Sequence, residues 1–233
     1  MKRMMGWLTV LLLCLTGCTS RFAAASTAPD PTEITGYIAL TFDDGPSPLY
    51  TSRLLDGLKE RDAHATFFVV GQLIPGQEEL LRRMAAEGHQ IGNHTQNHRD
   101  LSKLTLSQAQ QETALTAAAL EEALGPGERW IRPPYGFISD AQMAAAEVPL
   151  VYWSVDTEDW SLRDKDRILD GMLRQIGDGD IVLMHDIYPT SVEAALAAVD
   201  HFRAKGYRFV TLEELFALRG KTPPLHTLIR GTA

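Results

Sequence analysis

Cysteine is almost absent from this sequence of 233 residues, because its only two copies are Cys14 and Cys18, both near the start. The rest of the chain can form no disulfide, so it must fold on its apolar core alone. A long apolar run is also missing. The run from Trp7 to Leu15 is shorter than the roughly 20 apolar residues that a membrane-spanning helix needs. The first absence excludes a fold stabilised by disulfides. The second means that this run is too short to span a bilayer as a helix.

Basic residues are scarce relative to acidic ones. The 22 Lys and Arg residues face 30 Asp and Glu residues, which gives a formal net charge of −8. Removal of residues 1–17 would take away Lys2 and Arg3 and no acidic residue, and this loss of two positive charges would change −8 to −10. A chain of this sign has no overall attraction for phosphate backbones or other anionic polymers. We therefore expect no nucleic-acid partner.

The first residues have the pattern of an export signal. Lys2 and Arg3 precede the apolar run, which ends in Leu15-Thr16-Gly17-Cys18 and there resembles the lipobox of bacterial lipoproteins. We expect a signal peptide over 1–17, a lipid on Cys18, and a bacterial membrane-anchored lipoprotein that faces the cell exterior or the periplasm. An ordinary signal peptide cut near Ala23-Ala24-Ala25 is the alternative.

A single globular domain is expected after a linker. Residues 18–34 are rich in Ser, Thr, Ala and Pro, which is typical of a flexible tether. About 200 residues follow, enough for one domain with a sizeable core. We place this domain at 35–220 and a C-terminal tail at 221–233.

Short apolar runs alternate with helical patterns through the domain. The strands expected from these runs are 37–42, 65–70, 89–92, 130–132, 150–155, 180–184 and 207–210. The helices expected between them are 48–60, 77–87, 105–124, 139–146, 164–175 and 191–204. This alternation predicts an α/β fold of parallel βα units. About seven units are fewer than the eight of a complete barrel, so we expect an irregular or open (β/α) barrel, with a doubly wound sheet as the alternative.

Polar residues gather at or just after the C-terminal ends of five expected strands. These groups are Asp43-Asp44, His94 to His98, Arg132 to Tyr135, Asp156 to Trp160, and His185-Asp186. In parallel barrels that end of the strands carries the active site, so residues from all five units can converge there. The convergence predicts an enzyme.

The most informative group is Asp43-Asp44, which follows an apolar run and precedes Gly45-Pro46. Side chains alternate along a strand, so adjacent aspartates would diverge unless a turn at Gly45-Pro46 lets both reach one cleft. Two carboxylates so close resist joint ionisation unless a cation or an arginine lies between them. The pair therefore predicts a metal site with a basic partner.

His94 and His98 are the expected metal partners. Residues four apart share one face of a helical turn, and neutral imidazoles are good zinc ligands. Two histidines and one aspartate would leave a fourth position open, as catalytic zinc sites do. A solvated or core-bonded histidine pair is the ordinary alternative for this spacing, and Asp43-Asp44 favours the metal.

Five motifs together resemble those of the polysaccharide deacetylases, the NodB-homology carbohydrate esterases. They are Thr41-Phe42-Asp43-Asp44-Gly45-Pro46, His94-Thr95-x-x-His98, Arg132-Pro133-Pro134-Tyr135-Gly136, Asp156-x-x-Asp159-Trp160 and Leu183-x-His185-Asp186, in this order over residues 41–186. The resemblance implies a distorted (β/α)7 barrel in a single catalytic domain. It also implies a divalent metal, usually Zn²⁺ with Co²⁺, Ni²⁺ or Mn²⁺ as alternatives, and removal of N- or O-acetyl groups from sugars.

The resemblance also implies roles for the motif residues. Asp44 joins His94 and His98 on the metal, while Asp43 stays off it as the general base. Arg132 pairs with and orients Asp43 through its fork of donors, although a surface ion pair is the ordinary alternative for an arginine taken alone. These assignments supply the base and the Lewis acid that metal-assisted hydrolysis needs.

The remaining roles concern the oxyanion, the leaving group and the acetyl pocket. The backbone N–H of Tyr135, aimed by a stiff Pro133-Pro134 loop, would stabilise the oxyanion. His185 would protonate the departing amine, with Asp159 tuning or orienting it. The expected pocket walls are Trp160, Leu183 and Pro134. Taken alone, Trp160 and Leu183 would be interpreted as core residues. Residues expected only to brace loops or the core, or to lie exposed, are Asp156, Asp186, His64, His89 and His201.

The expected function is metal-dependent removal of acetyl groups from an N-acetylated extracytoplasmic glycan, such as peptidoglycan, chitin oligomers or poly-N-acetylglucosamine. Alternatives are an O-acetyl esterase acting on a xylan-like polysaccharide, a metal amidase acting on a small non-sugar amide, a phosphoesterase, and a glycan-binding module without turnover. The expected partners are the acetylated glycan and, through the lipid, a membrane. We expect a monomer.

Overall fold

The computed structural model describes residues 34–232. The expected signal peptide at 1–17, the lipidation site Cys18 and the linker up to residue 33 lie outside the described residues. Within 34–232, none of the helices combines the length and the apolar character that crossing a membrane requires.

A parallel sheet forms the centre of the domain, and β1 (Gly36–Asp43) is its middle strand. The strand order is β3-β2-β1-β6-β5, with β7 paired to the first part of β1. Successive β1 residues alternate between two cores, because Ile38 and Leu40 pack in one apolar cluster and Ala39 packs in the other. Both faces are therefore covered, as in parallel sheets generally. The bounds of the other strands are β2 Thr66–Val69, β3 Gln90–Asn93, β5 Val155–Asp156, β6 Ile181–His185 and β7 Tyr207–Phe209.

The barrel closes through short and irregular pairings. Single bridges join Asn93 to Ile131 and Ile131 to Leu150, and β4 (Leu150–Val151) pairs with β8 (Leu228–Ile229). The expected strand at 130–132 is thus one bridge residue, because Pro133 and Pro134 have no N–H with which to extend a ladder. The expected strand at 150–155 splits into β4 and β5, because Tyr152 N–H donates to Ile229 while Ser154 N–H donates to Ile181.

The segment after residue 220 is part of the domain and not the expected tail. Besides β8, Gly231 bridges to Asp180, and the side chain of Lys221 donates to the carbonyl of Thr232. Ile229 is buried in the core. A short apolar stretch near a chain end gives no sequence signal for a strand partner so distant in the chain, which is why it reads as a tail.

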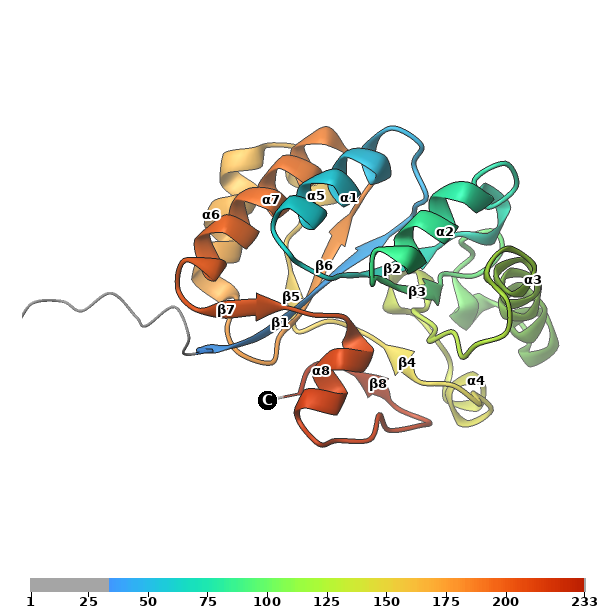
Figure 1. The fold of residues 1–233 in the computed structure, drawn as a ribbon. Coiled ribbons are helices and arrows are strands. Elements are labelled where there is room, and N and C mark those ends of the chain that lie inside the picture. Colours follow the sequence, from blue (N-terminus) through green and yellow to red (C-terminus); the bar gives the residue numbers. More distant parts are fainter. Residues whose placement is uncertain (1–33, 233) are drawn as a thin grey trace, which may run out of the picture.

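Helices surround the sheet on its outer side (Figure 1). Their bounds are α1 Tyr50–Glu60, α2 Glu78–Ala86, α3 Leu106–Leu124, α4 Asp140–Ala144, α5 Asp159–Leu162, α6 Lys165–Gln175, α7 Pro189–Arg203 and α8 Leu212–Leu218. α1 buries Leu54, Leu55 and Leu58, which lie on one face at helical spacing. α3 begins with a capping box between Thr105 and Gln108.

α8 closes the end of the barrel opposite the site. Its backbone N–H groups at Leu212 and Glu213 donate to the first residues of β2 and β3, Thr66 and Gln90. Its apolar residues, including Phe216, pack with Trp130 and others in the inner core cluster. The C-terminal ends of the strands are therefore the end that side chains from the loops can line.

Candidate active site

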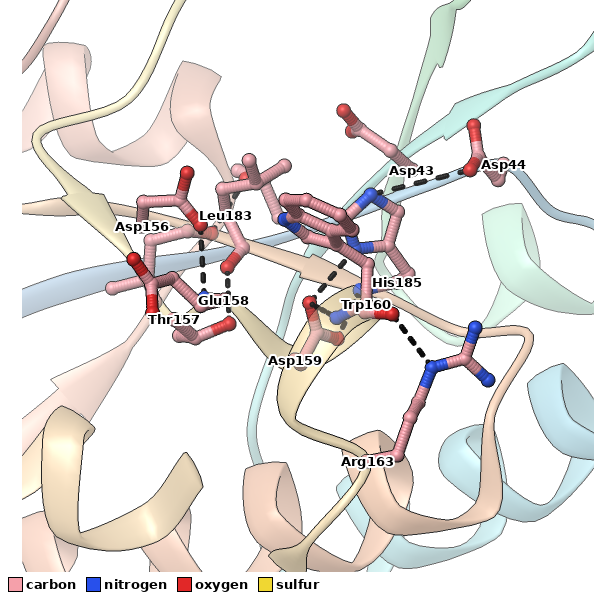
Figure 2. Close-up of polar contacts among 12 residues, drawn as sticks. Asp43, Asp44, Asp156, Thr157, Glu158, Asp159, Trp160, Arg163, Leu183 and His185 are labelled. Atoms are coloured by element: carbon pink, nitrogen blue, oxygen red, sulfur yellow. Dashed lines mark hydrogen bonds and ion pairs between the residues drawn. The ribbon is translucent and has the colours of Figure 1, made fainter. Parts of the chain in front are cut away.

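The end of β1 places both aspartates at one site. Asp43 is the last residue of β1 and pairs in register with His185, the last residue of β6. Asp44 follows with a left-handed φ of 71°, which turns the chain before Gly45 and Pro46. The turn brings the two adjacent carboxylates to the same side instead of opposite faces. Figure 2 shows them together beside the imidazole of His185.

Arg132 binds Asp43 from inside the barrel. Its Nη1 donates to Asp43 Oδ1 at 2.8 Å and to Thr41 Oγ1 at 2.7 Å, and its Nη2 donates to the Tyr152 carbonyl at 2.8 Å. The guanidinium lies 4.3 Å from the ring centroid of Phe68 and is 0% exposed. A buried cation with these partners has one orientation, so it fixes the Asp43 carboxylate, which is itself buried.

Asp44, His94 and His98 gather around one point. Each offers a ligand atom, and these atoms lie within 4.8 Å of one another. Nε2 of His98 is 3.1 Å from Asp44 Oδ1, and Nε2 of His94 is 3.5 Å from the same oxygen. The expected helical turn is wrong: residues 94–98 are a loop in which Thr95 and His98 have φ values of 67° and 53°. Asn93 supports this loop by accepting from the Thr95 N–H at 2.8 Å.

The three residues fit a divalent cation. Nδ1 of His94 lies 2.7 Å from the Arg132 carbonyl, which can only accept, so Nδ1 is the protonated nitrogen and Nε2 presents a lone pair. That lone pair faces Asp44 Oδ1, a buried oxygen with no hydrogen-bond partner within residues 34–232. Two acceptors facing each other across 3.5 Å repel unless a cation lies between them. The orphaned oxygen is therefore the observation that favours a metal.

The pKa values of these groups suit the same purpose. Burial lowers the pKa of His94, so its imidazole stays neutral and able to bind a metal. Burial acts to raise the pKa of Asp44, but the hydrogen-bonding contact with His98 and the electrostatic influence of the neighbouring imidazoles outweigh it and lower the pKa to about 2. Both ligands are thus in the metal-binding form at neutral pH.

His185 and Asp159 form a second polar pair. Nδ1 of His185 lies 2.8 Å from Asp159 Oδ1, and the backbone N–H of His185 donates to Asp159 Oδ2 at 2.8 Å. Burial acts to lower the pKa of His185, but the bond to Asp159 and the charges of Asp159, Asp43 and Asp44 raise it to about 9. Nε2 of His185 points toward the site, 4.0 Å from Asp44 Oδ2. A protonated imidazole therefore faces the metal-binding residues (Figure 2).

The loop after Ile131 presents a free backbone donor. Tyr135 has φ 60° and ψ 6° within the short 3₁₀ turn Pro134–Gly136. Its N–H has no hydrogen-bond partner among the bonds within residues 34–232, whereas the next two N–H groups donate to Pro133 and Pro134. Its ring lies edge-on to His98, with 4.8 Å between the centroids. The residue that carries this free N–H is therefore a neighbour of the metal-binding residues.

The expected pocket residues lie at different depths. Trp160 is exposed, Leu183 is buried in the middle of β6, and Pro134 is buried in the Tyr135 loop. Trp160 directly follows Asp159, the residue that binds His185. Each belongs to an element or turn that also carries another predicted site residue: Asp159 in α5, His185 in β6 and Tyr135 in the turn Pro134–Gly136.

Two residues expected only to brace loops do so in the structure. Thr51 Oγ1 donates to the buried carboxyl of Asp186, whose oxygen also lies against Gly45. Burial raises the pKa of Asp186 to about 7. Asp156 accepts from the Glu158 N–H at 2.9 Å. Asp186 therefore holds the turn after Asp44, and Asp156 holds the loop before Asp159.

Glu112 of α3 supports the site and is missed by sequence reasoning. Its carboxylate is buried and accepts from the backbone N–H of Asn97 at 2.8 Å and from Asn97 Nδ2 at 3.0 Å. It therefore holds the loop that carries His98. A lone glutamate in a helix looks like any solvated helical acid, so the sequence gives no signal for this role.

The protein-family model for polysaccharide deacetylase matches residues 31–152, more than half of the chain. The chain belongs to the polysaccharide deacetylase family. Its fold, a mostly parallel sheet closed as a distorted (β/α)7 barrel, is that of the solved family members.

Similar proteins of this family act on several glycans. The chain is 41% identical over 178 residues to the peptidoglycan-N-acetylmuramic acid deacetylase PdaC of Bacillus subtilis, covering 76% of this chain and 38% of that protein. It is 42% identical over 160 residues to a chitooligosaccharide deacetylase of Bradyrhizobium sp., covering 67% and 73%. A family 4 acetyl xylan esterase from Clostridium thermocellum, solved with a cobalt ion, matches with a TM-score of 0.80 at 30% identity, covering 84% and 98%. The chain thus spans well under half of the peptidoglycan deacetylase that it matches.

Proposed function

We propose that this protein is a metal-dependent hydrolase that removes acetyl groups from N-acetylated sugars of an extracytoplasmic glycan. The observation that carries the proposal is the orphaned Asp44 oxygen facing the lone pair of His94, beside an Asp43 carboxylate held separately by Arg132. One carboxylate is available to a cation and the other to a proton. The names of the similar deacetylases support the acetylated glycan as substrate.

Asp44, His94 and His98 would hold the metal, with Zn²⁺ the best match for one carboxylate and two imidazoles. A divalent cation held there supplies a Lewis acid for the acetyl carbonyl and makes water a better nucleophile.

The side chains of this protein account for the proton transfers. Asp43 accepts a proton from the attacking water while the water oxygen bonds to the acetyl carbon. The Tyr135 N–H donates to the carbonyl oxygen as it becomes negative. Protonated His185 then gives its proton to the amide nitrogen, the carbon–nitrogen bond breaks, and acetate and a free amino sugar leave. Trp160, Leu183 and Pro134 would wall the acetyl methyl group.

The direct test uses purified protein stripped of metal by a chelator and then reloaded with zinc. We expect acetate release from N-acetylglucosamine oligomers that is absent after stripping and restored by zinc. Acetylated xylan and a phosphomonoester, assayed in parallel, separate the deacetylase from an O-acetyl esterase and a phosphoesterase. Reloaded protein that releases acetate from none of the acetylated glycans would contradict the proposal.

We further propose that a lipid on Cys18 anchors the protein to a bacterial membrane. The support is the apolar run followed by Leu15-Thr16-Gly17-Cys18 in the sequence. In cells, the protein should partition with membranes and incorporate labelled fatty acid, and Cys18→Ala should lose both properties. Unlabelled wild-type protein in the soluble fraction would contradict the anchor.

A further inference from the structure

The end of the barrel opposite the candidate site differs in charge from the rest of the molecule. Residues 201–232 contain six Lys and Arg residues and two Asp and Glu residues, a formal charge of +4, so the rest of the chain, whose total is −8, carries −12. Among the basic side chains of 201–232, Arg219 alone has an acidic partner within residues 34–232. An acidic protein thus has a basic stretch whose charges are mostly not neutralised by neighbours.

The start of β1 lies beside this basic stretch. The N–H of Thr35 donates to the carbonyl of Gly206 at 2.9 Å, and its hydroxyl donates to the carbonyl of Lys205 at 2.6 Å. Gly206 directly precedes β7, which runs parallel to β1, so both strands begin at the same end of the barrel (Figure 1). This is the end that α8 closes.

Two arginines flank Tyr37 at the same end. Arg208 of β7 is the register partner of Tyr37, and the guanidinium of Arg219, the residue after α8, lies 5.6 Å from the Tyr37 ring centroid. Asp178 is the acidic neighbour, because its carboxylate binds Arg219 and accepts from the Tyr37 N–H at 2.8 Å. Lys221, two residues after Arg219, is exposed. The basic side chains therefore gather at the base of the barrel.

We call the accessible residues at this end the base patch. They are Ile34, Lys205, Arg208, Leu218, Arg219 and Lys221. Four basic residues and the acidic neighbour Asp178 give this patch a local charge of +3, four minus one. Ile34 and Leu218 are 47% and 51% exposed. Such a surface is complementary to a bilayer with anionic headgroups, because cations attract the headgroups and apolar side chains enter the interface.

The chain that precedes the described residues leads from the base patch to the proposed lipid. Ile34 is 16 residues after Cys18, and 16 residues span at most about 58 Å when fully extended. A lipid on Cys18 would therefore be joined to the base of the barrel and not to the end that carries the metal-binding residues.

We infer that the base patch lies against an anionic lipid bilayer. In this orientation the metal-binding residues face away from the membrane, where a glycan outside the membrane can reach them. A neutral bilayer would hold the domain through the lipid alone and leave its orientation free. The inference goes beyond the proposed chemistry and rests on the proposed attachment at Cys18.

The test attaches the zinc-loaded chain of residues 18–233 through Cys18, its single cysteine, to a maleimide-bearing phospholipid. The vesicles consist either of phosphatidylcholine alone or of phosphatidylcholine and phosphatidylglycerol in equal amounts. A membrane-impermeant amine reagent labels the lysines, and mass spectrometry gives the labelling rate of each. Lys205 and Lys221 report on the base patch. Lys103, in the hollow that His98 also lines, and Lys165, at the start of α6, are internal controls.

We expect phosphatidylglycerol to slow the labelling of Lys205 and Lys221 by at least about fivefold, the factor expected for a single charge at an anionic surface. Labelling of Lys103 and Lys165 should not change. High ionic strength should remove the protection, because it screens the headgroups.

Lys205→Gln/Arg208→Gln should remove most of the protection at Lys221. The matched control Lys165→Gln/Arg167→Gln removes the same two charge types at exposed positions of α6 and should keep the protection.

Equal labelling of the base-patch lysines on both vesicle types, or an equal loss of protection in the control variant, would overturn the inference. Protection of Lys205 and Lys221 on phosphatidylcholine alone would also overturn it, because the base patch would then contact neutral lipid or another copy of the chain.

The chemical attachment keeps this inference apart from the earlier proposals. It supplies the tether whether or not Cys18 carries a lipid in cells, so failure of the proposed anchor does not decide the outcome for the base patch. Acetate release from N-acetylglucosamine oligomers by the same samples tests the proposed function separately. Lys205→Gln/Arg208→Gln should not change that release, because both residues lie at the end of the barrel opposite the site.

Discussion

Asp159 changes what His185 can do at neutral pH. The imidazole would ordinarily lose its proton near about 6.5, but its bond to buried Asp159 raises its pKa to about 9. A raised pKa keeps the imidazole protonated to higher pH. Protonated His185, the proposed acid, is therefore present below pH about 9 and is lost as the pH rises through that value. Activity that needs the acid should fall over the same range.

Asp159→Asn should move this alkaline limit toward the ordinary pKa of histidine, because the amide keeps the shape of Asp159 without its charge. The measurement is the pH dependence of kcat/KM for both proteins. Asp164→Asn, which alters a carboxylate that caps α6, should leave the limit where it is in the wild type. An Asp159→Asn protein with the wild-type alkaline limit would contradict the role of Asp159.

The residues that gather at the candidate site could be selected from the sequence, although their roles remain predictions. Asp43, Asp44, His94 and His98 could be picked out because their side chains are chemically distinctive and follow strands that parallel βα units bring together. The path of the chain between His94 and His98 could not be predicted from the sequence. Thr95 and His98 both have left-handed φ values, which are most common in glycine. Because neither residue is glycine, the sequence gives no signal for this turn.

At the scale of elements, α3 supports the metal-binding loop from outside the barrel. Its Glu112 binds both the backbone and the side chain of Asn97, one residue before His98. The loop has no regular structure of its own, so these bonds and that of Asn93 position its histidines. α3, whose sequence predicts only an amphipathic helix, therefore contributes to the site through Glu112.

Glu112→Gln should lower zinc affinity by about 10- to 100-fold, the usual cost of losing a partner that orients a ligand. The new amide group would repel one of the two Asn97 donors. Zinc affinity is measured by competition with a chromophoric chelator. Glu122→Gln, at an exposed position of the same helix, is the matched control and should bind zinc as the wild type does. Unchanged affinity in Glu112→Gln would show that the loop does not depend on α3.

Strand prediction failed where a segment changes partners. Residues 150–155 read as one apolar strand, yet Val151 pairs with β8 while Val155 pairs with β6. An apolar run shows that a segment is buried, but it does not show which neighbours its N–H groups will find. Closure of the barrel is therefore a property of the whole chain and not of any one segment.

At the scale of the whole molecule, the last residues complete the inner core. Ile229 is 3% exposed and packs with Trp130 and Val151 in the cluster that fills the barrel. β8 pairs with β4, and Gly231 just after it bridges to Asp180, the residue before β6. The C-terminal stretch thus stabilises the barrel whose strand ends carry the site residues.

Ile229→Ala should lower the free energy of unfolding by about 2–4 kcal/mol, because it leaves a cavity in this core. Leu225→Ala, in the same segment but 46% exposed, should change it by less than about 0.5 kcal/mol. Denaturant unfolding measures both. Equal effects of the two substitutions would mean that the C-terminal segment does not complete the core.

The central claim is that the adjacent carboxylates of Asp43 and Asp44 have different tasks. The most direct measurement determines bound zinc and acetate release on the same samples of Asp43→Asn and Asp44→Asn. We predict that Asp43→Asn binds one zinc ion per chain like the wild type but loses about 10²- to 10⁴-fold in turnover, whereas Asp44→Asn loses zinc and turnover together. Full turnover in Asp43→Asn, or wild-type zinc binding in Asp44→Asn, would contradict the claim.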